Sequence, residues 1–267
     1  MKKRFVFIVF VLFTLCLYAQ NSNFLDGYQF SYGGEFWLEI KDNKILEHNY
    51  HDGKEIEGFS YEINENGFVE FTDAYNKNYV KKFFLLSGSI TYVVQDAFHQ
   101  PVLDDSQLIS INSSGYFSEK IKGKLVEYKA ENLRSAVIWG GREDPFWYYD
   151  WNEPFVTKRG NSGIGEYIDL SFVNPQKSIS ILGGFVRTTR QDLFKKNNRL
   201  KKVLIKDLDS DYSVIMNFED IAMFQGIAFE KYLKNIRIEI LEVYKGTQYD
   251  DTCISGIMIS NFYPLKK

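Results

Sequence analysis

Between residues 28 and 95, the chain is a series of short runs in which apolar and polar positions alternate. Turn residues separate these runs, among them Asp52-Gly53 and Asn66-Gly67. Alternation with a period of two puts the apolar side chains on one face of a strand, and such dipeptides between two runs are typical of β-hairpins. The pattern predicts an antiparallel meander of about six or seven strands, or a small barrel, without a long helix.

The alternation stops at residues 96–107, which contain a proline and several polar side chains, and a second series of strand-like runs follows. The clearest run is 235–240, where three isoleucines alternate with polar residues. Strands of this number and spacing predict a sandwich or jelly roll. We therefore predict an all-β protein, with a β-rich N-terminal domain of unknown role at 21–107 and a β-sandwich at 108–264.

The first twenty residues predict export. Three basic residues at 2–4 precede an apolar run that ends near Tyr18, and the small residue Ala19 follows. This is the layout of a secretory signal peptide over residues 1–20, and the run is short for a membrane span. Cys16 raises lipid attachment as an alternative, which the preceding leucine disfavours because the attachment box normally has a small residue there. The expected location is the periplasm, the cell surface or the medium.

Composition narrows the classes of function. The chain has a net charge of −3, and removal of the signal peptide takes away three cations and no anions. An acidic chain without a basic block is not expected to bind nucleic acid. The mature part keeps one cysteine, Cys253, so no internal disulfide is expected, and none of its apolar runs reaches the length of a membrane span. Aromatic residues make up 17% of the chain, which favours the pleated surfaces of β structure.

Residues 244–257 place two adjacent acids between two strand-like runs. Gly246 permits a turn, and the short oxygen-bearing side chains of Asp250, Asp251 and Thr252 can bond nearby backbone N–H groups. We interpret the group as shaping a loop, with contact to a ligand as the alternative. A calcium site is disfavoured because one acidic pair lacks the roughly six oxygens that Ca²⁺ requires.

A glycine-containing turn and an arginine each have two interpretations. Gly163, Gly165 and Glu166 precede a strand-like run, whereas a dinucleotide-binding loop would need a third glycine and a following helix. We therefore interpret these glycines as a tight turn, and no cofactor is expected. Arg199, at the start of a predicted strand, could bind an acidic ligand, or pair with a buried acid such as Glu166 or Asp251.

Residues 144–154 combine five aromatic side chains with acids and an amide. Exposed rings stack on the C–H faces of sugars, while carboxylates and amides bond the hydroxyl groups. Trp147 and Trp151, together with Glu153, are therefore candidate sugar contacts. The alternative is that both tryptophans belong to the core or to a domain interface.

Histidine chemistry is disfavoured in the second domain, which contains no histidine, so a histidine-based triad is not expected there. His48 and His51 lack the further ligands that zinc would need, and no metal site is expected. An acid pair of the glycosidase type stays open because carboxylates are abundant.

Four separated segments carry a resemblance. They contain a Ser-Ser pair, a Gly-x-Gly-Glu turn, an Asn-Asn-Arg, and a Lys-Gly followed by Asp-Asp-Thr. In this order the segments are 111–133, 161–172, 183–205 and 236–257. Together they resemble discoidin-like modules of the galactose-binding jelly-roll class. The nearest subgroup is the glycan-binding domain that accompanies a secreted bacterial NAD-glycohydrolase and assists its translocation. The resemblance spans about residues 109–260 and leaves 21–105 without a counterpart.

The resemblance implies a non-enzymatic β-sandwich that binds carbohydrate in loops at one end. The positions that match the family pattern are Gly163, Gly165, Glu166, Asn198, Arg199, Gly246, Asp250, Asp251 and Thr252. The segment with Trp147 and Trp151 departs from the family, because it is longer and has extra aromatic residues.

We therefore predict an exported glycan-binding protein that is not an enzyme. The predicted contacts with the glycan are Trp147, Trp151, Glu153, Asn198, Arg199, Asp250 and Asp251. One alternative is a module of the cell envelope that binds another exported protein. The other is an acid-pair hydrolase with its site between the two domains.

Overall fold

The computed structural model describes most of the chain, and most of the described residues lie in strands. It describes residues 29–32, 36–42, 44–49, 52–73, 80–81, 83–87, 90–94, 108–139, 154–158, 160–187 and 190–259. The all-β prediction is confirmed. The predicted signal peptide and Cys16 lie outside the described residues, as does the predicted domain boundary near residue 107. None of the helices in the described ranges is long and apolar enough to cross a membrane.

The N-terminal part forms a six-stranded sheet in which each strand pairs with the next one along the chain. The strands are β1 (Gln29–Tyr32), β2 (Phe36–Lys41), β3 (Lys44–Asn49), β4 (Glu55–Ile63), β5 (Val69–Asp73) and β6 (Val80–Lys81). All of these pairs are antiparallel, so the sheet is the predicted meander. The next two strands, β7 (Phe83–Ser87) and β8 (Ile90–Val94), form a separate antiparallel pair.

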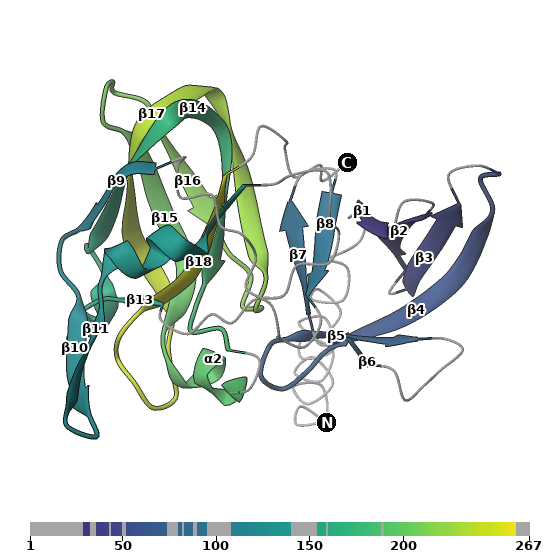
Figure 1. The fold of residues 1–267 in the computed structure, drawn as a ribbon, viewed down its shortest axis with the longest axis horizontal. Coiled ribbons are helices and arrows are strands. Elements are labelled where there is room, and N and C mark those ends of the chain that lie inside the picture. Colours follow the sequence, from purple (N-terminus) through teal and green to yellow (C-terminus); the bar gives the residue numbers. More distant parts are fainter. Residues whose placement is uncertain are drawn as a thin grey trace, which may run out of the picture.

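The C-terminal part is a curled sheet of eight strands, ordered β12-β18-β14-β17-β15-β16, with β13 on β18 and β9 on β14. Its strands are β9 (Leu108–Ser113), β12 (Val137–Trp139), β13 (Phe155–Val156), β14 (Tyr167–Gly183), β15 (Arg199–Asp207), β16 (Ser213–Asn217), β17 (Phe224–Tyr244) and β18 (Cys253–Ile259). A separate hairpin of β10 (Phe117–Ile121) and β11 (Lys124–Tyr128) projects from one end (Figure 1).

The two longest strands, β14 and β17, bend together and let one sheet close over its own core (Figure 1). The register between them shifts between Ser171 and Gln176 and again before Ser178. Pro175 lies in this stretch, and a proline cannot donate a ladder hydrogen bond, so it suits a bulge. Before the bulge β14 pairs with β9, and after it with β18. Bulges bend strands and increase their twist, which is how a strand turns the corner of a sandwich.

The core follows from the period of two along these strands. Ile236, Ile238 and Ile240 of β17 are each at most 2% exposed, which confirms the prediction that they share one face. Between them, Arg237 points to the other face, where its guanidinium donates to both carboxylate oxygens of Asp169 at 2.8 and 2.9 Å. The inward side chains of β14, β15 and β18 complete the core with Ile168, Leu170, Phe172, Val203, Ile205, Ile254 and Ile257.

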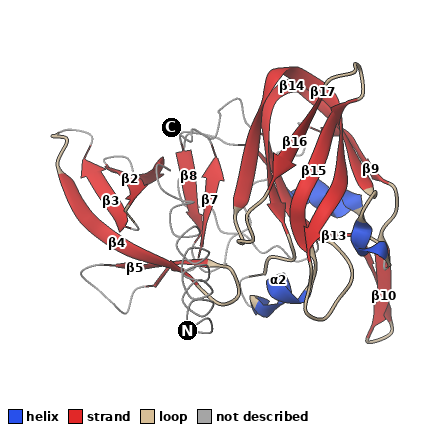
Figure 2. Cartoon of the chain, turned by 180° about the vertical axis from the view of Figure 1, so that it is seen from behind, coloured by secondary structure: helices blue, strands red, loops and turns tan. Residues whose placement is uncertain are grey.

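A short helix, α2 (Asp192–Lys196), connects β14 to β15 at the lower end of the sandwich (Figure 2). Two 3-10 helices, η2 (Ala130–Ala136) and η3 (Asn161–Gly163), occupy other connections. Asp192 lies in the first turn of α2, where the helix dipole favours an acid, and it also pairs with Lys196 one turn later.

The turn between β4 and β5 packs against α2. Phe68 is fully buried, and its ring meets that of Phe194 edge to face with 6.0 Å between the centroids. Asn64 donates to the Gln191 side chain at 2.9 Å. Gly67 has φ +84°, and a Cβ there would come within 2.9 Å of the Phe194 ring, so only glycine fits this turn. The meander is thereby fastened to the lower end of the sandwich.

Candidate functional site

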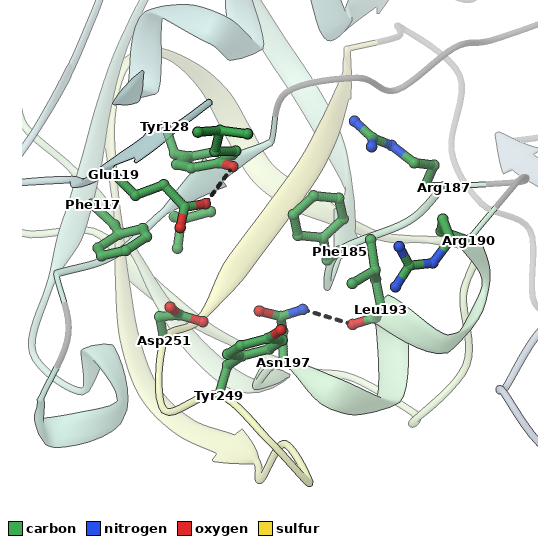
Figure 3. A pocket seen from close by; sticks show the side chains of 12 residues that line it. Phe117, Glu119, Tyr128, Phe185, Arg187, Arg190, Leu193, Asn197, Tyr249 and Asp251 are labelled. Atoms are coloured by element: carbon green, nitrogen blue, oxygen red, sulfur yellow. Dashed lines mark hydrogen bonds between the residues drawn. The ribbon is translucent and has the colours of Figure 1, made fainter. Parts of the chain in front are cut away.

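A pocket of about 280 Å³ opens at the α2 end of the sandwich (Figure 3). Its walls come from the β10–β11 hairpin, β13, the segment between β14 and β15, and the loop between β17 and β18. The lining residues are Phe117, Glu119, Ile121, Tyr128, Val156, Phe185, Arg187, Arg190, Leu193, Asn197, Tyr249 and Asp251. Segments far apart in sequence thus bring aromatic, acidic, basic and amide side chains to one cavity.

The hairpin forms one wall because alternate residues of a strand share a face. Phe117, Glu119 and Ile121 follow this spacing on β10 and line the pocket. Tyr128 stands opposite Phe117 in the register, and the two rings stack with centroids 6.0 Å apart. The Tyr128 hydroxyl donates to Glu119 Oε1 at 2.9 Å, which fixes the direction of that carboxylate. This wall therefore offers ring faces beside an oriented acid.

The opposite wall begins where β14 ends. Gly184 has φ +119°, a conformation that disfavours other residues, and its N–H donates to the Cys253 carbonyl at 2.8 Å. Ser255 Oγ donates to the Gly184 carbonyl and accepts from the Val186 N–H. These bonds anchor the backbone on either side of Phe185. The Arg187 guanidinium lies 5.6 Å from the centre of the Phe185 ring.

The third side comes from α2 and the loop before β18. Asn197 is 5% exposed, and its amide donates to the Leu193 carbonyl at 2.8 Å. Asp251 is 3% exposed although it lines the pocket. Burial and the nearby Asp251 charge raise the pKa of the Cys253 thiol well above its ordinary value, so this cysteine is an inert core residue. Tyr249 stands half-buried at the edge, with its N–H bonded to the Lys196 carbonyl at 2.9 Å.

Several predicted site residues join the last loop to the start of β15. Asn198 is 1% exposed, and its side-chain oxygen accepts from the Gly246 N–H at 2.7 Å. Asn198 also forms a parallel β-bridge with Thr252, whose hydroxyl donates to the Ser162 carbonyl at 2.5 Å. A Cβ on Gly246 would clash with the backbone of Lys196. In this geometry the side chains hold loop against loop.

The turn before β14 is drawn into the same network. Gly163 has φ +72°, and a Cβ there would lie 2.6 Å from the Thr157 hydroxyl, so the glycine permits this close approach. Gly165 has φ +83° and donates to the Ile240 carbonyl at 2.8 Å. Glu166 does not line the pocket, and its carboxylate accepts from Ser114 at 3.4 Å.

Arg199 forms its hydrogen bonds within the protein. Its Nε and Nη2 donate to the two oxygens of Asp220, each at 2.8 Å, and Nη1 donates to three backbone carbonyls. Arg199 is 5% exposed and does not line the pocket. The partner acid is Asp220 rather than either of the two acids that the sequence suggested, because the strand order places β15 and the turn after β16 together.

Asp250 is exposed but strongly hydrogen-bonded. Its Oδ1 accepts from Ser162 at 2.6 Å, from Asn198 at 3.3 Å and from Lys245 at 3.2 Å. These three bonds, in that order of importance, lower the pKa of the Asp250 carboxyl from 3.8 to about 2. Because the pKa of Asp250 is lower in the folded protein than in the unfolded chain, the ionised carboxylate stabilises the fold at pH values above 3.8. This contribution is lost as the pH falls through about 2.

This shift gives a direct prediction. An NMR titration of the Asp250 carboxyl carbon is expected to have its midpoint near pH 2. Ser162→Ala is expected to move the midpoint up towards 3.8, because it removes the largest contribution. A midpoint near 3.8 in the unmodified protein would show that the loop is not held by these bonds.

The remaining predicted contacts, Trp147, Trp151 and Glu153, lie outside the described residues. Sequence reasoning missed the ring pair of the β10–β11 hairpin and both pocket arginines. A signal for the hairpin existed: Phe117 and Tyr128 stand at mirrored positions about a Lys-Gly turn. Among the residues that the structure describes, no group of three or more His, Cys, Asp or Glu side chains is arranged to hold a metal ion.

Residues 150–260 match the family model of the NAD glycohydrolase translocation F5/8 type C domain. This match agrees with the resemblance to discoidin-like modules seen in the sequence. No curated protein matches the chain.

Solved structures similar to the chain include two from Clostridium perfringens. The family 32 CBM of NanJ, in complex with galactose, has 12% identity and a TM-score of 0.32, and the match covers 55% of this chain and 90% of that one. CBM32-1 from a family 31 glycoside hydrolase has 12% identity and a TM-score of 0.35, covering 58% and 96%. An F5/8 type C domain from Bacteroides fragilis has 15% identity and a TM-score of 0.33, covering 56% and 89%. These likenesses are remote and say nothing of this chain's ligand.

Proposed function

From the F5/8 type C segment and the pocket beside it, we propose that the chain is an exported, non-enzymatic protein that binds a glycan at the α2 end of its sandwich. The observation that carries the proposal is the composition of the pocket. Four aromatic rings line it together with two carboxylates, two guanidinium groups and one amide. A sugar presents apolar C–H faces and hydroxyl edges, so rings and polar groups in one cavity suit it.

The size of the pocket supports a small ligand. Pockets for drug-sized molecules run from roughly 300 Å³ upwards, and this one is about 280 Å³. One sugar residue of a longer glycan fits this scale, with the rest of the chain in solvent. The polar side chains are also pre-positioned, since Glu119 and Asn197 already make bonds within the protein. Pre-organisation lowers the entropy cost of binding.

The aromatic segment stays part of the proposal. Val156 lines the pocket, and Glu153 precedes it by three residues, a span of at most about 10 Å of extended chain. We therefore propose that Trp147, Trp151 and Glu153 contribute a further edge of the site. Asn198, Arg199 and Asp250 support the loops rather than touch the sugar in this proposal. Among the predicted polar contacts that the structure describes, Asp251 is the one that lines the pocket.

The test begins with a glycan array to identify a ligand and continues with calorimetry on variants of the mature protein. Tyr249→Ala is expected to weaken binding about tenfold or more, because a ring that stacks on the ligand is lost. Tyr232→Ala is the matched control: this tyrosine is 64% exposed and does not line the pocket, so its loss is expected to leave the dissociation constant unchanged.

Three outcomes would count against the proposal. Equal effects of the two tyrosine variants would remove the pocket as the site. A blank array from folded protein would favour an exported protein partner instead. Cleavage of a bound oligosaccharide, seen by mass spectrometry, would show that the protein is a hydrolase and would make the two pocket carboxylates the candidate acid pair.

A further inference from the structure

We infer that the glycan carries an anionic group, a carboxylate or a sulfate ester, which is held by Arg187 and Arg190. This inference rests on the proposed function and names the class of ligand that the same pocket takes. It follows from how charge is distributed around the cavity.

The charged residues of the pocket are separated by sign. In Figure 3, Glu119 and Asp251 lie on one side of the cavity, and Arg187 and Arg190 lie on the other, beyond the Phe185 ring. The two ends therefore favour different parts of a ligand. Carboxylates accept hydrogen bonds from hydroxyl groups, whereas guanidinium groups donate to oxygens and favour negative ones.

Arg190 retains donors for a ligand. Its Nε and Nη2 donate to the two oxygens of Asp192, at 2.9 and 3.0 Å, and this pairing holds the guanidinium in place. Within the described ranges, no hydrogen bond engages its Nη1 group, and the side chain is 55% exposed. Asp192 does not line the pocket, so the acid orients Arg190 from behind.

Arg187 adds the second cation. Its guanidinium lies over the Phe185 ring, and arginine is a residue that both stacks on aromatic faces and recognises oxyanions. Two arginines at one end exceed what a neutral sugar needs, since a hydroxyl oxygen gains little from a second positive charge. A carboxylate or a sulfate offers two or more oxygens to such a pair.

The charged residues of the pocket also fix the orientation of the bound sugar. An anionic group would be repelled by the end with Glu119 and Asp251, so it must lie at the arginine end with the sugar hydroxyls directed at the acids. The Phe185 ring, which lies between the two ends in Figure 3, then meets a C–H face of the sugar. This orientation distinguishes an acidic sugar from its neutral parent at a single position of the ring.

The experiment compares matched sugars by calorimetry on the mature protein. The probes are D-galacturonic acid, galactose 6-sulfate and D-galactose, with D-glucuronic acid and D-glucose as a second pair. At least one anionic sugar is expected to bind about tenfold more tightly than its neutral parent at low salt. The preference is expected to shrink at about 0.5 M salt, because both arginines are partly open to solvent. At this salt concentration the Debye length is roughly 4 Å, so exposed charges are strongly screened.

Variants then localise the effect. Arg190→Gln is expected to reduce the ratio of anionic to neutral affinity from about tenfold to within about twofold. Lys234→Gln removes the same charge from an exposed residue that does not line the pocket, and the ratio is expected to stay unchanged. Circular dichroism of each variant checks that it is folded.

The results separate this inference from the proposed function. Equal binding of neutral and anionic sugars, still lost in Tyr249→Ala, would overturn the inference and leave the glycan site standing. An anionic preference that falls as much in Lys234→Gln would also overturn it, because the effect would then be one of net charge. Absence of binding to every sugar would remove both. Binding of the carboxylate but not the sulfate, or the reverse, would identify the anionic group.

Discussion

Asp220→Ala is expected to lower the free energy of unfolding by about 3 kcal/mol. The carboxylate of Asp220 holds the Arg199 guanidinium through two bonds of 2.8 Å and accepts a third from Lys195 at 2.8 Å. The arginine side chain is only 6% exposed, so removal of the acid leaves a charge that is buried and uncompensated. Chemical denaturation at neutral pH measures the loss.

The chain contains a matched control for this change. Asp192 also pairs with one arginine and one lysine, Arg190 and Lys196, but all three side chains are at least 36% exposed. Asp192→Ala is expected to lose little stability, because water screens exposed ion pairs. Equal losses in the two variants would show that burial of Arg199 is not what makes the first pair important.

The pH dependence of this loss has a defined sign. Burial raises the pKa of the Asp220 carboxyl, but the bonds from Arg199 and Lys195 outweigh burial, and the pKa lies below its ordinary 3.8. The contribution of Asp220 is therefore complete above pH 3.8 and is lost as the pH falls through the folded value. The difference between Asp220→Ala and the unmodified protein is expected to shrink below pH 3.8. A difference that grows on acidification would contradict the assignment.

The fold could be predicted from the sequence because β structure is a local pattern. The isoleucines at 236, 238 and 240 identify their own strand and its inward face without knowledge of the partners. The pairing of strands could not be predicted in this way. β14 pairs with β9, β17 and β18, and a bulge near Pro175 decides where the pairing changes from β9 to β18. No period in the sequence shows which strand lies next to which.

The pocket was harder to predict for the same reason. Its lining comes from four separate segments, and only the topology brings Phe117, Phe185 and Tyr249 together. Motif reasoning instead selected residues that match a family pattern, such as Asn198 and Arg199. These residues are buried and bonded within the protein, at 1% and 5% exposed. A family pattern selects residues that support the fold as readily as residues that touch a ligand, because either role restricts which residue type can occupy the position.

Phe68→Ala is expected to cost about 3 kcal/mol of stability, an effect as large as that of the buried charge. Phe68 is fully buried although it lies in a turn of the meander, because the turn inserts against α2. Its removal leaves a cavity between the two parts of the chain. Glu65→Ala, in the same turn but exposed, is the control and is expected to cause no measurable loss.

A double-mutant cycle measures the coupling free energy between the meander, through Phe68, and the sandwich, through Phe194. Phe68 and Phe194 meet edge to face at an angle of 72°, a geometry expected to couple them by about 1 kcal/mol beyond burial. Phe194 belongs to α2 and lies between the pocket residues Leu193 and Asn197 in sequence, so a loose Phe194 would also disturb the pocket wall. Phe68→Ala is therefore expected to weaken ligand binding although Phe68 touches no ligand. A coupling near zero, with binding unchanged, would mean that the meander and the pocket are independent.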